Sequence, residues 1–102
     1  MSTIDYKEWL LEQLRDLDFA AGYITEAIAE GESPFLLAVR DVVEAQGGLG
    51  ALSKSTSLNR EGLYDMLSER GTPRLSSLAT VFGALGLQIA VTKKKARAAK
   101  AA

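Results

Sequence analysis

Between residues 52 and 67 the chain reads LSKSTSLNREGLYDML, and the helical spacing of its leucines is interrupted for only three residues. Residues 49–56 have the pattern of one short helix, and residues 60–68 that of a second, which Asn59 can cap. Two helices joined by so short a turn cannot lie antiparallel, so they must cross steeply and share a small core. The expected members of that core are Leu52, Leu58, Leu63 and Leu67. This is the spacing of a helix-turn-helix.

Further helices are predicted on both sides of this unit. Apolar residues recur at helical spacing over residues 6–16, 19–30, 33–46 and 75–85. The residues expected to cap the first three of these helices are Asp5, Asp18 and Ser33. The apolar face of the first helix is expected to be Tyr6, Leu10, Leu14 and Leu17. Gly31 and the pair Gly47-Gly48 are expected to end helices and separate them from the next ones.

Residues 87–92 alternate between large apolar and small or polar side chains, which is the period of a half-buried strand. Leu87, Ile89 and Val91 would share one face of that strand. Because a lone strand is unstable in water and no mate is evident in the chain, we expect it to pair with the strand of a second copy in a two-fold dimer. An extended tail lying on its own domain is the alternative.

With 102 residues, the chain has room for one modest core. The predicted fold is all-α: residues 1–92 form a single helical domain with one short C-terminal β-strand. Within it, residues 1–46 are acidic helices, residues 47–86 are the helix-turn-helix core and residues 87–92 are the strand. Residues 93–102 are predicted to be a basic, flexible tail.

Two residue types are missing, and their absence narrows the chemistry. The chain has no histidine and no cysteine, so it lacks the usual proton-transfer group at neutral pH and the usual ligands of transition metals. We therefore expect no enzyme, no cofactor, no metal site and no small-molecule substrate. No secretory leader or membrane-spanning run is recognisable, and the expected location is the cytoplasm.

Charge divides the chain in two. Residues 1–46 contain ten acidic and three basic side chains, whereas residues 47–102 contain nine basic and three acidic ones. Such asymmetry favours two partners of opposite sign, a polyanion for the second half and a basic protein for the first. The alternative is that the basic tail only keeps the protein in solution.

The second helix of the unit is the one that would enter a DNA major groove. The residues predicted to read base edges there are Asn59, Arg60, Glu61 and Tyr64. The residues predicted to contact phosphates are Lys54, Arg70, Arg74, Lys93 and Lys94. On spacing alone, the alternative is an ordinary pair of helices in a small bundle whose charges are solvated.

The segment from Phe35 to Val91 resembles the Cro/repressor-like (Xre-type) helix-turn-helix family, and more closely the HigA-like antidote proteins of addiction modules. The stretches that carry the resemblance are FLLAVRD at 35–41, Gly47-Gly48, Asn59-Arg60-Glu61 before Leu63-Tyr64, Gly71-Thr72-Pro73-Arg74, and Leu85-Gly86-Leu87. Three positions depart from the usual pattern, namely Ser53, Ser57 and Gly62. Ser57 occupies a turn position where glycine is common, and a left-handed serine there would be strained.

The resemblance implies an antitoxin of a type II toxin–antitoxin module, which binds a RelE-like (HigB-like) ribonuclease toxin and represses its own operon as a homodimer on operator DNA. The side chains expected to face the toxin are Asp16, Asp18, Phe19, Tyr23, Glu26 and Glu30. Burial of both aromatics inside the domain is the alternative. Two other functions stay open: a stand-alone repressor, and a protein-interaction adaptor that no longer touches DNA.

Overall fold

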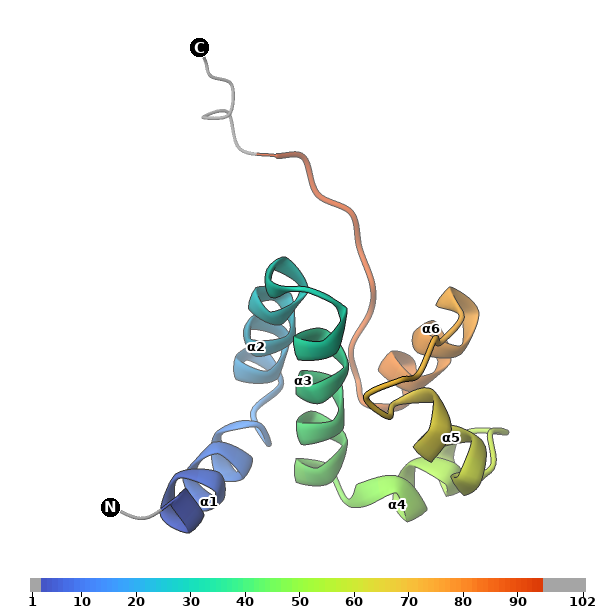
Figure 1. The fold of residues 1–102 in the computed structure, drawn as a ribbon, viewed down its shortest axis with the longest axis horizontal. Coiled ribbons are helices and arrows are strands. Elements are labelled where there is room, and N and C mark those ends of the chain that lie inside the picture. The colour runs from blue at the N-terminus through green and yellow to red at the C-terminus, as the bar shows by residue number, and fades with distance from the viewer. Residues whose placement is uncertain (1–2, 95–102) are drawn as a thin grey trace.

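The computed structural model describes residues 3–94, with side chains from Asp5 onward, and this part of the chain is built from α-helices alone (Figure 1). The helices are α1 (Thr3–Gln13), α2 (Leu17–Glu30), α3 (Glu32–Ala45), α4 (Gly48–Ser55), α5 (Arg60–Met66) and α6 (Leu75–Ala84). The all-α prediction is therefore confirmed. No helix in the described part combines the length and the hydropathy needed to cross a bilayer.

The predicted C-terminal strand is wrong, because no strand is present among residues 3–94. Gly86 has a φ of 86°, and the Leu87 N–H donates to the Phe82 carbonyl at 2.8 Å. This turn packs Leu87 against the core of its own chain. Residues 88–90 still border α2 and α6, whereas beyond them the segment leaves the helices (Figure 1) and Val91 is almost fully exposed. Apolar alternation alone does not make a strand, because a strand also needs a hydrogen-bonded neighbour.

Helix α3 lies at the centre of the molecule. It packs on α1, α2 and α4, and α4 in turn packs on α5 and α6. The core side chains that α3 supplies are Leu36, Ala38, Val39, Val42 and Val43. Of the expected helix-turn-helix core, Leu52, Leu63 and Leu67 are buried and Leu58 is partly buried against them. The hydrophobic contacts of α5 are thus continuous with those of the whole domain.

Three predicted caps lie inside the helices that they were expected to precede. Helix α1 begins at Thr3, so Asp5 lies in its first turn and does not precede it. Helix α2 is capped by Asp16 instead of Asp18: the Asp16 Oδ1 accepts from the N–H groups of Asp18, at 2.8 Å, and Phe19, at 3.3 Å. Helix α3 begins at Glu32, which places Ser33 inside its first turn. Several neighbouring residues were chemically able to cap, and the sequence does not rank them.

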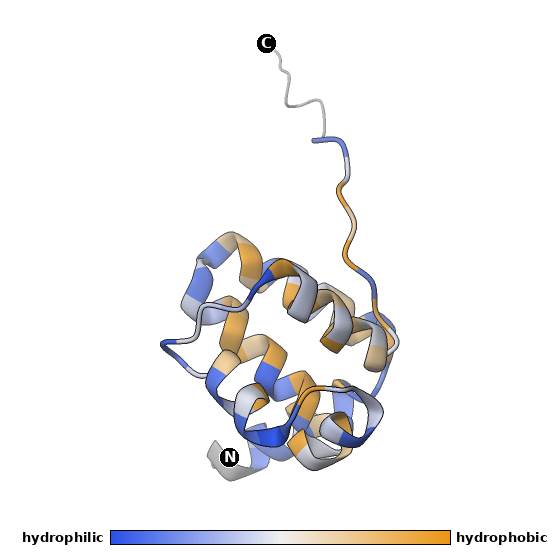
Figure 2. Ribbon diagram, turned by 90° about the vertical axis from the view of Figure 1, so that its right-hand side faces the viewer, coloured by the Kyte–Doolittle hydropathy of each residue, from blue (hydrophilic) through white to orange (hydrophobic). Residues whose placement is uncertain are grey.

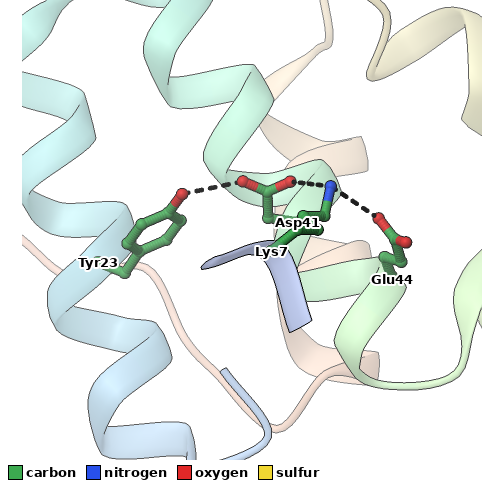
Figure 3. Close-up of polar contacts among 4 residues, drawn as sticks. All are labelled: Lys7, Tyr23, Asp41 and Glu44. Atoms are coloured by element: carbon green, nitrogen blue, oxygen red, sulfur yellow. Dashed lines mark hydrogen bonds and ion pairs between the residues drawn. The ribbon is translucent and has the colours of Figure 1, made fainter. Parts of the chain in front are cut away.

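A chain of polar contacts joins the first three helices (Figure 3). The Tyr23 hydroxyl of α2 donates to the Asp41 Oδ2 of α3 at 2.9 Å. The Lys7 Nζ of α1 lies 3.6 Å from the Asp41 Oδ1 and 3.4 Å from the Glu44 Oε1. Asp41 is only 7% exposed, so these partners compensate a carboxylate that has lost most of its water.

The same contacts act on the ionisation of Tyr23. Burial raises the pKa of Tyr23 well above its ordinary value of 10.0, and the hydrogen bond to Asp41 raises that pKa further. The phenol therefore remains a donor to Asp41 throughout the neutral range. Since the folded-state pKa is raised, this contribution to stability is fully present below pH 10 and is lost as the pH rises beyond it.

Candidate functional site

Side-chain hydroxyls fix the turn between α4 and α5. The Ser53 Oγ donates to the Leu58 carbonyl at 3.1 Å, and the Leu58 N–H donates to the Thr56 Oγ1 at 3.2 Å. The Thr56 Oγ1 also donates to the Leu52 carbonyl at 3.0 Å. The expected left-handed Ser57 is not found, because every positive φ in the described residues belongs to glycine. Ser53 thus ties the two helices together with a hydrogen bond.

Asn59 caps α5, as predicted. Its Oδ1 accepts from the Gly62 N–H at 2.6 Å. A Cβ on residue 62 would lie 3.1 Å from this oxygen, so glycine leaves room for the cap. The cap also limits base reading, because a bidentate contact to adenine needs both the oxygen and the nitrogen of an asparagine side chain. With its oxygen occupied, Asn59 has its amide nitrogen available.

All four predicted base-reading side chains are exposed, Asn59 as the N-cap of α5 and the other three on the helix, but they do not share one pocket. Arg60 and Tyr64 line a pocket of about 290 Å³ between α3, α4 and α5, where Arg40 joins them. Tyr64 is 65% exposed. Asn59 borders a separate, shallow groove on the other flank. The structure therefore brings Arg60 and Tyr64 together and separates them from Asn59.

The predicted phosphate contacts are also exposed, in three separate places. Arg70 and Arg74 line the groove beside Asn59, which has a volume of about 540 Å³. Lys54 is exposed in the last turn of α4. Lys93 and Lys94 follow the extended segment that leaves the helices (Figure 1). The rest of the predicted basic tail, residues 95–102, lies outside the described residues.

The segment predicted to be a helix-turn-helix is nearly neutral. Residues 47–92 contain four basic side chains and three acidic ones, and five of the nine basic side chains in the second half of the sequence fall within residues 93–102. Glu61 and Asp65 are exposed on α5. Because carboxylates repel phosphates, the attraction for DNA predicted for this half would come mostly from residues 93–102.

The predicted toxin-facing residues divide between surface and interior. The carboxylates that are exposed are Asp16, Asp18, Glu26 and Glu30. Phe19 is 39% exposed. Tyr23 is partly buried and directs its hydroxyl at Asp41 (Figure 3), which gives this side chain a structural contact inside the domain.

Two aromatic residues that sequence reasoning did not assign to a site lie beside Phe19. Tyr6 and Trp9 of α1 are 54% and 50% exposed. The ring centroids of Tyr6 and Trp9 are 5.9 Å apart, and those of Trp9 and Phe19 are 6.2 Å apart in an edge-to-face arrangement. Placing Tyr6 on the buried face of the first helix was wrong. For Trp9 the sequence did contain a signal. Leu10 and Leu14 lie four residues apart and are both buried, so they mark the buried face of α1, and Trp9 lies off that face.

Two comparisons with known proteins found a match, and one of the two gives a family. A family model described as "Probable addiction module antidote protein" matches residues 5–93. An uncharacterized protein of Haemophilus influenzae is 29% identical to the chain over 96 residues, which cover 84% of this chain and 98% of that protein. No solved structure matches the chain.

Proposed function

The chain belongs to the family of probable addiction module antidote proteins, and from this premise we propose that it neutralises a RelE-like (HigB-like) toxin and represses its own operon by binding operator DNA through α5. Membership in the family supports an antitoxin role, with a toxin as the partner and a regulatory function in place of an enzymatic one. The operator, the class of toxin and the HigA-like mode of DNA binding are parts of the proposal.

One observation carries the DNA-binding part of the proposal: α5 is a short, capped helix that is anchored by the buried Leu63 and exposes Arg60 and Tyr64. A recognition helix needs this combination of a fixed backbone and free side chains near its N-terminal end. Arg70 and Arg74 border the same helix and are free to contact the DNA backbone. The basic tail would add attraction that does not depend on sequence.

Arg60→Ala is expected to lose about 1–3 kcal/mol of discrimination at one base step, because a guanidinium can donate two hydrogen bonds to guanine. DNA fragments retained by the wild-type chain would supply the operator for gel-shift titrations. The matched control is Arg74→Ala, which should weaken all sequences alike and flatten the salt dependence of binding.

If Arg60→Ala leaves the preference for operator intact, α5 does not read the bases. A chain that retains no DNA fragments above background would be an adaptor. A chain that binds operator but whose operon encodes no toxin would be a stand-alone repressor.

We also propose that the chain binds DNA as a homodimer. Apolar side chains that are exposed lie near the C-terminal segment, namely Ile28, Leu75, Ile89 and Val91. Three of them, all but Val91, line a groove of about 250 Å³ between α2, α6 and residues 87–90. Figure 2 shows hydrophobic residues along this segment where it runs on past the helices, and Val91 is 97% exposed there. Covering such a surface with a second copy would also match a palindromic operator.

Light scattering tests the dimer. The wild-type chain is expected to have the molar mass of a dimer, and Ile89→Asp that of a monomer with weaker operator binding, because a buried carboxylate without a partner is costly. Leu37→Asp is the control, since Leu37 is 50% exposed on α3 and lies outside the groove. An Ile89→Asp variant that stays dimeric would place the interface elsewhere.

A further inference from the structure

We propose that the rings of Tyr6, Trp9 and Phe19, here called the aromatic patch, form the surface on which the basic toxin docks. This inference rests on the proposed function and names the contact surface that the function requires. The three rings touch in sequence, with centroid separations of 5.9 and 6.2 Å, and each is between 39% and 54% exposed. Contiguous exposed aromatic surface is rare on a protein that has no partner.

The patch has a carboxylate border. On α1, Trp9 follows Asp5 by four residues and precedes Glu12 by three, so that all three lie along neighbouring rows of the helix surface. Asp18 directly precedes Phe19 and is exposed. Within residues 3–19 there are five acidic and two basic side chains.

Both of those basic side chains are paired with acidic ones. Lys7 contacts Asp41 and Glu44 on α3, and an Arg15 nitrogen lies 3.8 Å from the Glu12 Oε1. Lys7 is thus directed at α3, and Arg15 offsets part of the charge of Glu12, which leaves a net charge of −3 for residues 3–19.

Exposed aromatic rings bordered by carboxylates favour a partner whose surface has arginine or lysine side chains around an apolar contact. Cations are attracted to the faces of aromatic rings, tryptophan most strongly, and to the carboxylates that border them. A second copy of this chain fits poorly, because a two-fold contact would place acidic borders against each other. Aromatic anchors surrounded by charge are also the side chains that dominate binding energy in protein interfaces.

The position of the patch leaves the candidate DNA-binding surface free. In Figure 1, α1 lies on one side of the α2–α3 pair, and α5 and α6 lie on the other. The antidote could therefore hold its toxin and its operator at the same time.

The test uses the purified product of the gene adjacent to this one as the binding probe. Trp9 is the only tryptophan of the chain, so 5-fluorotryptophan labelling gives one fluorine signal from the patch itself. We expect that signal to shift on titration, and we expect Trp9→Ala to weaken binding by at least about tenfold in calorimetry. The matched control is Tyr64→Ala, which removes an exposed aromatic from α5 and should leave affinity within about twofold.

A second pair of variants tests the acidic border. Glu12→Gln combined with Asp18→Asn, both in that border, should slow association several-fold at low salt, with a smaller effect at high salt. The control is Asp65→Asn combined with Glu69→Gln, which removes the same charge from the region of α5 and should leave the association rate unchanged. Glu26→Gln combined with Glu30→Gln tests the rival docking place farther along α2, which the sequence pattern predicted.

Four outcomes overturn the proposal. If the wild-type chain binds the product but the fluorine signal stays still and Trp9→Ala binds normally, the patch is wrong and the antidote function stands. Slower association for the Glu26 and Glu30 pair alone would place the toxin on the C-terminal half of α2. A Trp9→Ala variant that changes from dimer to monomer would assign the patch to a second copy. If the wild-type chain does not bind the product at all, the proposed function fails, and the patch with it.

Discussion

Gly71→Ala is expected to lower the free energy of unfolding by about 3 kcal/mol, a large effect for a change of one methyl group at a partly exposed turn. A Cβ on residue 71 would lie 2.1 Å from the Met66 carbonyl oxygen and 2.8 Å from the Asp65 carbonyl oxygen. Both are backbone atoms at the end of α5, so the clash cannot be relieved by rotating a side chain. The last turn of α5 or the 70–74 loop has to move.

The matched control is Gly22→Ala, the same substitution within α2. No atom lies within 4 Å of a Cβ built on residue 22. Since glycine in a helix interior costs about 0.5–1 kcal/mol relative to alanine, this variant should be more stable than the wild type. Urea unfolding followed by circular dichroism measures both variants.

If Gly71→Ala lowers the free energy of unfolding and Gly22→Ala raises it, the close approach of the 70–74 loop to α5 is supported. Gly71→Ala at wild-type stability would mean that the loop does not pack there, and that Arg70 and Arg74 are not held beside α5. Since both arginines are proposed phosphate contacts, a displaced loop should also weaken operator binding.

Much of the fold follows from local patterns in the sequence. The break at residues 57–59 predicted α4, the turn and α5, and the structure confirms both the start of α5 at Arg60 and its cap by Asn59. The double glycine correctly predicted the boundary between α3 and α4, because Gly47 and Gly48 both have positive φ. Patterns of this kind are set by neighbours in the chain.

The errors come from features that depend on distant residues. Alternation at residues 87–92 suggested a strand, but a strand requires a neighbour, and the described residues supply none. Tyr6 was assigned to the buried face of α1, although contacts with α3 decide which face is buried. Asp41 lies buried in an apolar helix because Tyr23 and Lys7 approach it from other helices, and no spacing within α3 reveals them.

In the candidate sites, too, sequence patterns predicted the local features and missed those that depend on distant residues or on side-chain contacts. Sequence spacing placed the exposed Arg60 and Tyr64 on the second helix of the motif, and the structure shows them on one pocket. Spacing did not reveal that the Asn59 oxygen is already occupied by the Gly62 N–H. Nor did it reveal the aromatic patch, because Phe19 lies on a different helix from Tyr6 and Trp9.

We propose that this chain is an antidote whose toxin-binding and DNA-binding surfaces lie apart. Growth of cells that produce the adjacent gene product from an inducible promoter tests it most directly. We expect that product alone to stop colony formation and the wild-type chain to restore it fully, because a toxin held in a tight complex is not free to act.

Two variants in the same experiment separate the surfaces. Arg60→Ala should rescue as well as the wild type, since Arg60 lies on α5, away from α1. The double variant Trp9→Ala, Phe19→Ala should fail to rescue at matched protein levels, because it removes two of the three rings of the aromatic patch. If the wild-type chain does not restore growth to cells that the adjacent gene product arrests, the chain is not the antidote of that product and the account is contradicted.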